Sequence, residues 1–237
     1  MNDSYWVILP AAGVGARMQA KQPKQYLTLN GQYLIDQTIQ RLLNHEKITN
    51  IAVGLSVNDA YWLDSIWAND KRIHRYIGGK ERSDTVLNGL SFIMDRHAIK
   101  DEFVLVHDAA RPLISLSEID DLLANTNPVG ALLALPAKDT IKQSQQDLEH
   151  YTAHVESTLD RQYIWQAQTP QKFKADVLFT ALLAAHAKNA VITDESSALE
   201  FMGQKPDLVE GKASNFKVTL PIDLLIAQSL LPALDKH

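Results

Sequence analysis

Small and cationic residues are gathered in one short stretch near the start of the chain, PAAGVGARMQAKQPKQYLTL at residues 10–29. Its small residues would let backbone N–H groups come close to a phosphate, and they are Ala11, Ala12, Gly13 and Gly15. Arg17 and Lys24 follow in the same stretch, where they could fold over that phosphate and neutralise its charge. The stretch therefore favours a loop that binds a nucleoside triphosphate, although a glycine turn with solvated cations remains an alternative.

The same glycines complete neither of two common nucleotide-binding motifs. The dinucleotide fingerprint G-x-G-x-x-G needs a third glycine, and Met18 stands in its place. The Walker-type phosphate loop needs a Gly-Lys-Ser/Thr ending, which this stretch lacks. An NAD-dependent reductase is therefore disfavoured. Tight binding of a nicotinamide cofactor would be the observation that supports such a reductase.

A second glycine pair ends an apolar run in the segment IGGKERSDTVLNGL, residues 77–90. Gly78 and Gly79 close the expected strand, and Ser83 or Asp84 is expected to cap the helix that follows. A free helix N-terminus can receive a polar ligand. Alone, the segment is explained as well by structure as by function, but beside the first loop it predicts a nucleotide cradle.

Two further segments place a charged residue in or at the end of an expected buried strand. Asp108 ends the apolar run FVLVHDA, and a buried carboxylate there must be paired or must hold a cation. Mg²⁺ suits one carboxylate plus substrate phosphates, whereas a salt bridge to Arg111 is the rival explanation. Lys217, in the segment NFKVT, should likewise have an anionic partner. By contrast, His150 and His154 fall in an expected hairpin, and we predict no metal site there.

The elements that must position these residues alternate between short apolar runs and segments of helical period. This rhythm predicts an α/β fold, a mostly parallel sheet covered by helices on both faces, with the ligand crevice at the carboxyl ends of its strands. The expected strands are 6–9, 51–56, 75–78, 103–109 and 129–136, and the expected helices are 34–43, 61–67, 86–94 and 119–123.

The rhythm breaks at Lys138, where a polar hairpin is expected at about residues 137–159. An isolated two-stranded ribbon is marginal in water, so we expect it to pair with the same arm of a second subunit, with a mobile surface loop as the alternative. Helices are then expected at 176–188 and 196–202, the second capped by Thr193 or Asp194. A last strand at 215–219 and a closing amphipathic helix after Pro221 complete a single domain, residues 1–237.

Composition excludes several classes of protein. The formal net charge of −5 disfavours a nucleic-acid-binding surface, and no apolar run approaches the length needed to span a membrane. The chain has no cysteine, so disulfides, thiolate metal sites and a cysteine nucleophile are excluded. We therefore expect a cytoplasmic protein whose cations act locally.

Taken in order, these segments resemble one family along nearly the whole chain. The matching stretches are PAAGVGARM, PKQYL, GGKERSDTV, VHDAARP, KDTIK, DRQYIWQAQTPQKF, TDESSALE and EGKASNFKVT. They are similar to those of the 2-C-methyl-D-erythritol 4-phosphate cytidylyltransferases of the non-mevalonate isoprenoid pathway. The resemblance implies transfer of CMP from CTP to methylerythritol phosphate with release of pyrophosphate, a Rossmann-like sheet, Mg²⁺ as cofactor and a homodimer with exchanged arms.

The resemblance also implies roles for individual residues. The catalytic cations would be Arg17, Lys24, Arg161 and Lys217, the last two also positioning the sugar phosphate. The nucleotide would be bound by Ala11, Ala12, Gly13, Gly79, Thr85 and Asp108, and the acceptor also by Arg111, Thr140 and Thr169. Asp108 would hold the metal. The chain departs from the family at Ala16, where a basic residue is frequent, and at Thr85, where serine is expected.

Two other functions remain open at this point. A cytidylyltransferase for another polyol phosphate, such as ribitol 5-phosphate, would use the same nucleotide loops. A CTP sensor without catalysis would keep the fold, but it would have no need for Lys24, Asp108 and Lys217 around the reacting phosphorus.

Overall fold

A mostly parallel sheet of seven strands forms the centre of the protein in a computed structural model, which describes residues 4–13, 22–147 and 152–234. The strand order is β11-β7-β10-β6-β1-β4-β5, and only β10 runs antiparallel to its neighbours in this described part. The strands are β1 Tyr5–Pro10, β4 Ile48–Leu55, β5 Ile73–Ile77, β6 Phe103–Val106, β7 Gly130–Pro136, β10 Trp165–Lys174 and β11 Asp207–Glu210. The predicted α/β fold is confirmed.

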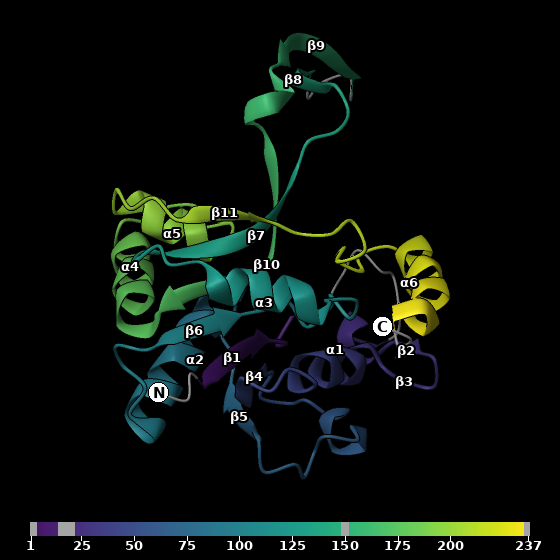
Figure 1. The fold of residues 1–237 in the computed structure, drawn as a ribbon, viewed down its shortest axis with the longest axis vertical. Helices are drawn as coiled ribbons and strands as arrows, with labels where there is room; N and C mark the ends of the chain where they lie inside the picture. The colour runs from purple at the N-terminus through teal and green to yellow at the C-terminus, as the bar shows by residue number, and fades with distance from the viewer. Residues whose placement is uncertain (1–3, 14–21, 148–151, 235–237) are drawn as a thin grey trace.

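Helices cover both faces of this sheet, as predicted (Figure 1). Consecutive residues of a strand point to opposite faces, so Val7 and Leu9 pack on one side of β1 while Trp6 and Ile8 pack on the other. Helices α1 (Leu34–Leu43) and α3 (Leu116–Ala124) contribute to the first core. Helices α2 (Arg82–His97), α4 (Ala175–Ala187) and α5 (Glu195–Phe201) contribute to the second.

Helix starts follow local capping chemistry, with one correction to the prediction. Helix α5 is capped by Asp194, whose side chain accepts a hydrogen bond from the backbone N–H of Ser197. Helix α2 begins at Arg82 and is capped by Glu81 rather than by Ser83 or Asp84. Asp84 instead lies in the first turn, where its Oδ2 accepts from the backbone N–H of Glu81 at 2.9 Å and completes a capping box.

The predicted arm is present. Strands β8 (Ile141–Asp147) and β9 (Thr152–Leu159) pair antiparallel, and a short 3₁₀ turn, η4 (Arg161–Tyr163), follows them. Figure 1 shows this hairpin projecting from the body beyond β7 and β10. The arm therefore has no cover from the rest of the described chain.

Two predicted elements are wrong. Residues 61–67 form only the 3₁₀ turn η3 (Trp62–Asp64), because Trp62 and Trp67 enter the core while Leu63 and Ile66 face solvent, so no single helical face is apolar. Residues 215–219 form no strand. They are held as an irregular segment, in which the N–H of Val218 donates to the carbonyl of Ala110 at 2.8 Å.

The remaining elements lie around the carboxyl ends of the strands. They are η2 (Lys24–Tyr26), the small hairpin of β2 (Thr28–Leu29) and β3 (Gln32–Tyr33), and helix α6 (Pro221–Leu234). Helix α6 packs on this hairpin through a separate small core that includes Leu29 and Leu231. None of the helices in the described residues is both long and apolar enough to cross a membrane.

Candidate active site

A cavity of about 250 Å³ opens where the chain changes direction across the sheet. From β1 the chain continues to β4 and β5 on one side, and it returns to β6 on the other side of β1. The ends of β1 and β6 therefore form the switch point at which open α/β sheets bind ligands. Ala11 directly follows β1, Asp108 lies two residues after β6, and both line the cavity.

The first loop is tied to the turn that carries Lys24. The backbone N–H of Ala11 donates to the carbonyl of Gly54 at 2.8 Å, and the side chain of Gln25 donates through Nε2 to the carbonyl of Ala11 at 2.7 Å. Because Gln25 follows Lys24 within η2, this bond also fixes where Lys24 leaves the backbone. Ala12 and Gly13 line the same wall of the cavity. No sequence pattern indicated this role for Gln25.

Gly79, the second residue of the glycine pair, lies in the opposite wall. The N–H of Gly79 donates to Thr85 Oγ1 at 3.0 Å, and the Thr85 hydroxyl donates to the carbonyl of Glu81 at 3.0 Å. A Cβ on Gly78 would lie 2.5 Å from Cβ of Ala12, and one on Gly79 would lie 2.1 Å from Cβ of Asp84. Only glycine therefore lets the two loops approach, and the Thr85 hydroxyl holds that approach in place.

Asp108 is the centre of a cluster of cations. Lys217 Nζ lies 2.9 Å from its Oδ2, Arg111 Nε lies 3.3 Å from the same oxygen, and Arg82 Nε lies 2.9 Å from Oδ1. Burial alone would raise the pKa of Asp108, but Arg82, Lys217 and Arg111 together hold it well below its usual value. The salt bridge to Arg111, which was the rival explanation for Asp108, is present. The anionic partner expected for Lys217 is Asp108.

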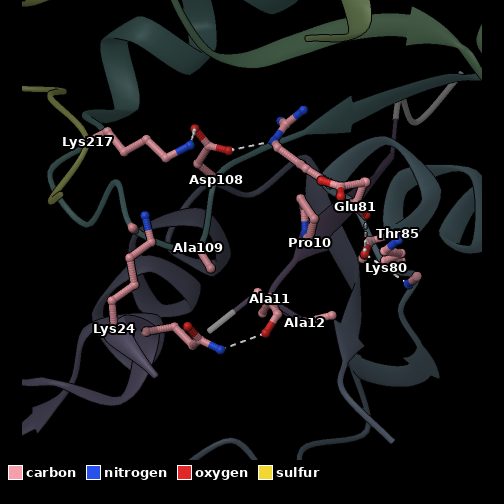
Figure 2. Close-up of a pocket in the computed structure, with 15 residues that line it drawn as sticks. Pro10, Ala11, Ala12, Lys24, Lys80, Glu81, Thr85, Asp108, Ala109 and Lys217 are labelled. Atoms are coloured by element: carbon pink, nitrogen blue, oxygen red, sulfur yellow. Dashed lines mark hydrogen bonds and ion pairs between the residues drawn. The ribbon is translucent and has the colours of Figure 1, made fainter. Parts of the chain in front are cut away.

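Lys24 and Lys217 lie on one side of the cavity, and Lys80 and Thr85 lie on the other (Figure 2). Lys24 comes from η2 and Lys217 from the irregular segment before α6, so residues far apart in the sequence converge here. Four of the segments singled out from the sequence, including the glycine pair and Asp108, thus meet at one cavity.

Sequence reasoning missed Arg82 and Glu195. Arg82 lines the cavity at the first residue of α2, where the positive end of the helix dipole disfavours a cation. Its guanidinium is held by Glu195, with Nη1 at 2.6 Å from Oε1 and Nη2 at 3.1 Å from Oε2. A cation in a helix's first turn was the signal that a carboxylate must lie nearby.

Below Asp108 lies a chain of buried hydrogen bonds through Thr169. The N–H of Asp108 donates to Thr169 Oγ1 at 3.0 Å, which leaves the hydroxyl hydrogen to donate to Nδ1 of His107 at 2.9 Å. Nε2 of His107 then donates to the carbonyl of Arg111 at 3.2 Å, because a carbonyl can only accept. Burial lowers the pKa of His107 to about 4, so the imidazole is neutral. Thr169 and Arg111 thus lie beneath the cavity wall and support Asp108.

The other predicted site residues lie elsewhere or outside the described residues. Thr140 and Arg161 are exposed on the arm, where Arg161 Nη1 donates to the carbonyl of Lys138. Arg17 and Ala16, like His150, fall outside the residues that the structure describes. His154 is exposed on β9, and the described residues include no group of three or more metal-ligating side chains.

The donor set around the cavity fits a cation whose ligands come mostly from substrate. Asp108 and Glu81 are the carboxylate residues that line the cavity within the described chain, and Glu81 is occupied as a helix cap. Asp108 alone would thus ligate a Mg²⁺ ion, with phosphate oxygens and water completing the shell.

Comparison with known proteins identifies the family. The family model for 2-C-methyl-D-erythritol 4-phosphate cytidylyltransferase matches residues 5–233. The chain belongs to this family. It is 45% identical over 223 residues to the family's enzyme from Pseudomonas syringae pv. tomato, covering 93% of this chain and 92% of that one. The Aliivibrio fischeri enzyme is 44% identical over 236 residues, covering 99% and 96%.

Solved structures of the family agree with this assignment. The crystal structure of the Francisella tularensis member matches with a TM-score of 0.80 and 34% identity, over 95% of this chain and 99% of that one. Membership makes the chain a cytidylyltransferase, an enzyme of the nucleotidyltransferase type, and supports the CTP-dependent formation of 4-diphosphocytidyl-2-C-methyl-D-erythritol. The predicted family and activity are confirmed.

Proposed function

We propose that the cavity around Asp108 transfers the CMP group of CTP to 2-C-methyl-D-erythritol 4-phosphate, with Mg²⁺ and within a homodimer. The observation that carries this proposal is the convergence of Lys24, Lys217 and Arg82 on one cavity at the switch point of the sheet. Two polyanions must meet for this reaction, so a site dense in fixed cations supplies what the chemistry needs.

The transfer needs no dedicated base on the protein. A phosphate monoester has a second pKa near 6, so its oxygen is already an anionic nucleophile near neutral pH. That oxygen attacks the α-phosphorus of CTP, the bond to the β-phosphate oxygen breaks, and pyrophosphate leaves with the electron pair. Lys24 and Lys217 neutralise the charge that develops, and Arg17 is proposed to join them from the first loop.

Mg²⁺ belongs to this proposal because Asp108 is a carboxylate that lines the cavity and does not serve as a helix cap. Asp108 would hold the ion, whose chemical contribution is to neutralise the phosphates and orient them for displacement. Ala11, Ala12 and Gly13 would present backbone N–H groups to the nucleotide, opposite the turn that Thr85 holds at Gly79.

The homodimer is proposed because the arm carries binding residues away from the cavity of its own chain. Thr140 and Arg161 are exposed there, beside apolar side chains that lack cover, including Tyr163 at 76% exposure. Helix α6, which begins just after Lys217, also exposes Ile222 and Leu225. We propose that each arm docks on the second copy and brings the partner's Arg161 to the acceptor phosphate near Lys217.

We further propose that the enzyme acts in the cytoplasm, without nucleic acid or membrane as a partner. The absence of cysteine and the net charge of −5 support this.

The test of the proposed function is turnover with defined acceptors. The protein is incubated with CTP and Mg²⁺ and with either 2-C-methyl-D-erythritol 4-phosphate or ribitol 5-phosphate, and pyrophosphate release is followed. We expect turnover with methylerythritol phosphate. Turnover with ribitol 5-phosphate alone would show that the acceptor is the other polyol phosphate. CTP binding without any turnover would indicate a CTP sensor.

A further inference from the structure

Glu195 is one of the most deeply buried charged groups that the proposed reaction leaves without a role. It is the first residue of α5, its exposed fraction is 1%, and it does not line the cavity. Burial raises the pKa of its carboxyl group, and the facing Arg82 opposes that rise. A buried carboxylate without a partner would cost several kcal/mol, so its position depends on Arg82.

Arg82 is bound on two sides at once. Its Nη1 and Nη2 face Glu195 in a paired, fork-like contact, while Nε faces Oδ1 of Asp108 at 2.9 Å. Although burial opposes its charge, Glu195 and Asp108 raise the pKa of Arg82 above its usual value, so the guanidinium stays charged. Because a guanidinium is rigid and planar, fixing one edge of it fixes the direction of the other.

The fixed edge of Arg82 decides which oxygen of Asp108 is open to Lys217. With Oδ1 taken by Arg82, Oδ2 is the oxygen that meets Lys217 Nζ at 2.9 Å. We propose that Glu195 is a positioning residue, which acts through Arg82 and Asp108 to set the place of the Lys217 ammonium for the transfer step. These contacts run from Glu195 at the N-terminus of α5 to Lys217 at the cavity. The proposal that they position Lys217 for the transfer rests on the proposed function.

A purely structural ion pair would behave differently from a positioning one. If Glu195 only stabilised the packing of α5 against α2, its removal would lower stability but leave the rate per folded molecule unchanged. If it positions Lys217, its removal must lower kcat in folded enzyme and must also change the surroundings of the Lys217 ammonium. The two outcomes are separable by experiment.

The first experiment compares Glu195→Gln with Glu200→Gln. Both changes remove a charge from α5, but Glu200 is exposed, and among the described contacts its side chain accepts only from Ser196 Oγ, at 2.6 Å. We expect Glu195→Gln to lower kcat by about 10- to 100-fold with KM for CTP changed by less than about 3-fold, as for residues that orient a group in direct contact. Glu200→Gln should match the parent enzyme.

A spectroscopic readout does not depend on turnover. In protein labelled with ¹⁵N-lysine, the side-chain NH₃⁺ signal of Lys217 is assigned by its loss in Lys217→Ala. We expect this signal to shift in Glu195→Gln and not in Glu200→Gln. If the parent enzyme turned over no acceptor, the proposed function would fail, and the lysine signal alone would still decide whether Glu195 positions Lys217.

A second variant covers the case in which Glu195→Gln does not fold. Replacing both partners, Arg82→Met with Glu195→Leu, removes the buried pair without leaving a lone charge, and such replacements are often tolerated. Asp108 keeps Arg111 and Lys217 as partners in this variant. We expect a folded protein with kcat lowered at least 10-fold. Unchanged kcat in the folded variants, or an unmoved Lys217 signal, would overturn the proposal.

Discussion

Lys217 has an ammonium group that is fixed on one side and open on the other. Asp108 holds it at 2.9 Å, and 31% of the lysine side chain remains exposed at the cavity. A charge placed in this way needs little reorganisation when negative charge builds up on a transferring phosphate. Lysine suits this position because it presents a compact charge on a long side chain, whereas the buried Arg111 acts below it as a support.

The first prediction concerns this lysine. Lys217→Ala should lower the transfer rate on the order of 100- to 1000-fold, because a fixed cation beside the reacting phosphate is lost. The protein should still fold, since Asp108 keeps Arg82 and Arg111. The measurement is pyrophosphate release at saturating CTP. Lys212→Ala is the matched control, because Lys212 lies five residues earlier and its Nζ contacts Ser117 Oγ at 2.7 Å. Equal rates in the two variants would contradict the role.

The second prediction concerns His107, which is buried and neutral below Asp108. Burial lowers its pKa from 6.5 to about 4, so the unfolded chain binds a proton more readily than the folded one. Stability from this group is complete above pH 6.5 and is lost as the pH falls towards 4, and the difference corresponds to about 3 kcal/mol. His107→Gln should therefore show a shallower fall in urea midpoint between pH 6.5 and 4 than the parent enzyme. Identical profiles would exclude this linkage.

At the scale of elements, the parts of the fold that follow a regular period were predictable. Helix α1 begins and ends where its apolar period predicted, and β1, β4, β5 and β7 were found within a few residues. Strands β10 and β11 were missed because their sequences, WQAQTPQKFK and DLVE, show no clear apolar run. β10 is placed by pairing with β6 and β7, which are remote in sequence.

The site follows the same division between local and remote information. The glycines, Lys24, Asp108 and Lys217 were found because each has an unusual type at its local position. The Arg82–Glu195 pair joins residues 113 positions apart, so no local pattern could specify it. Segment 215–219 was mistaken for a strand because Lys217, Val218 and their neighbours alternate in polarity, but one backbone bond to Ala110 replaces a strand ladder.

The third prediction compares the effects of adding a methyl group in each of the two glycine loops, at Gly79 and at Gly13. Gly79→Ala would place a Cβ 2.1 Å from Asp84, so the start of α2 must shift, with a cost of about 1–3 kcal/mol in stability and weaker CTP binding. At Gly13 no atom lies within 4 Å of the added Cβ, so Gly13→Ala should leave the melting temperature unchanged while it weakens CTP binding. Thermal melts and CTP titrations of both variants test this. Normal CTP affinity in Gly13→Ala would show that this backbone does not approach the phosphates.

At the scale of the whole molecule, the body and the arm carry complementary parts of the proposed site. The cavity of the body holds Lys24, Asp108 and Lys217, whereas Thr140 and Arg161 lie in the arm and in the turn that follows it. The arm strands pair only with each other among the described residues, and Val155 and Tyr163 are largely exposed. An uncovered two-stranded ribbon gains stability when it packs on another surface, so the arm is suited to bind a second copy.

The fourth prediction tests whether the site is shared between two chains. Lys217→Ala and Arg161→Ala should each be nearly inactive alone, since each removes a cation from every site. If the arms are exchanged, a heterodimer of the two variants has one site with both defects and one site with neither. Random pairing of equal amounts should then restore about a quarter of the parent rate, because half the dimers are mixed and each has one intact site.

The control for this mixture uses two variants of the same cavity. Lys24→Ala mixed with Lys217→Ala should restore no activity, because both residues line one chain's cavity and every mixed dimer has a defect at each site. The mixtures are made by refolding the two chains together, and their masses are checked by light scattering. Recovery only in the mixture with Arg161→Ala would mean that the arm completes the partner's site. No recovery in dimers of the correct mass would mean that each arm serves its own chain. An Arg161→Ala variant that is active alone would mean that Arg161 takes no part in the transfer.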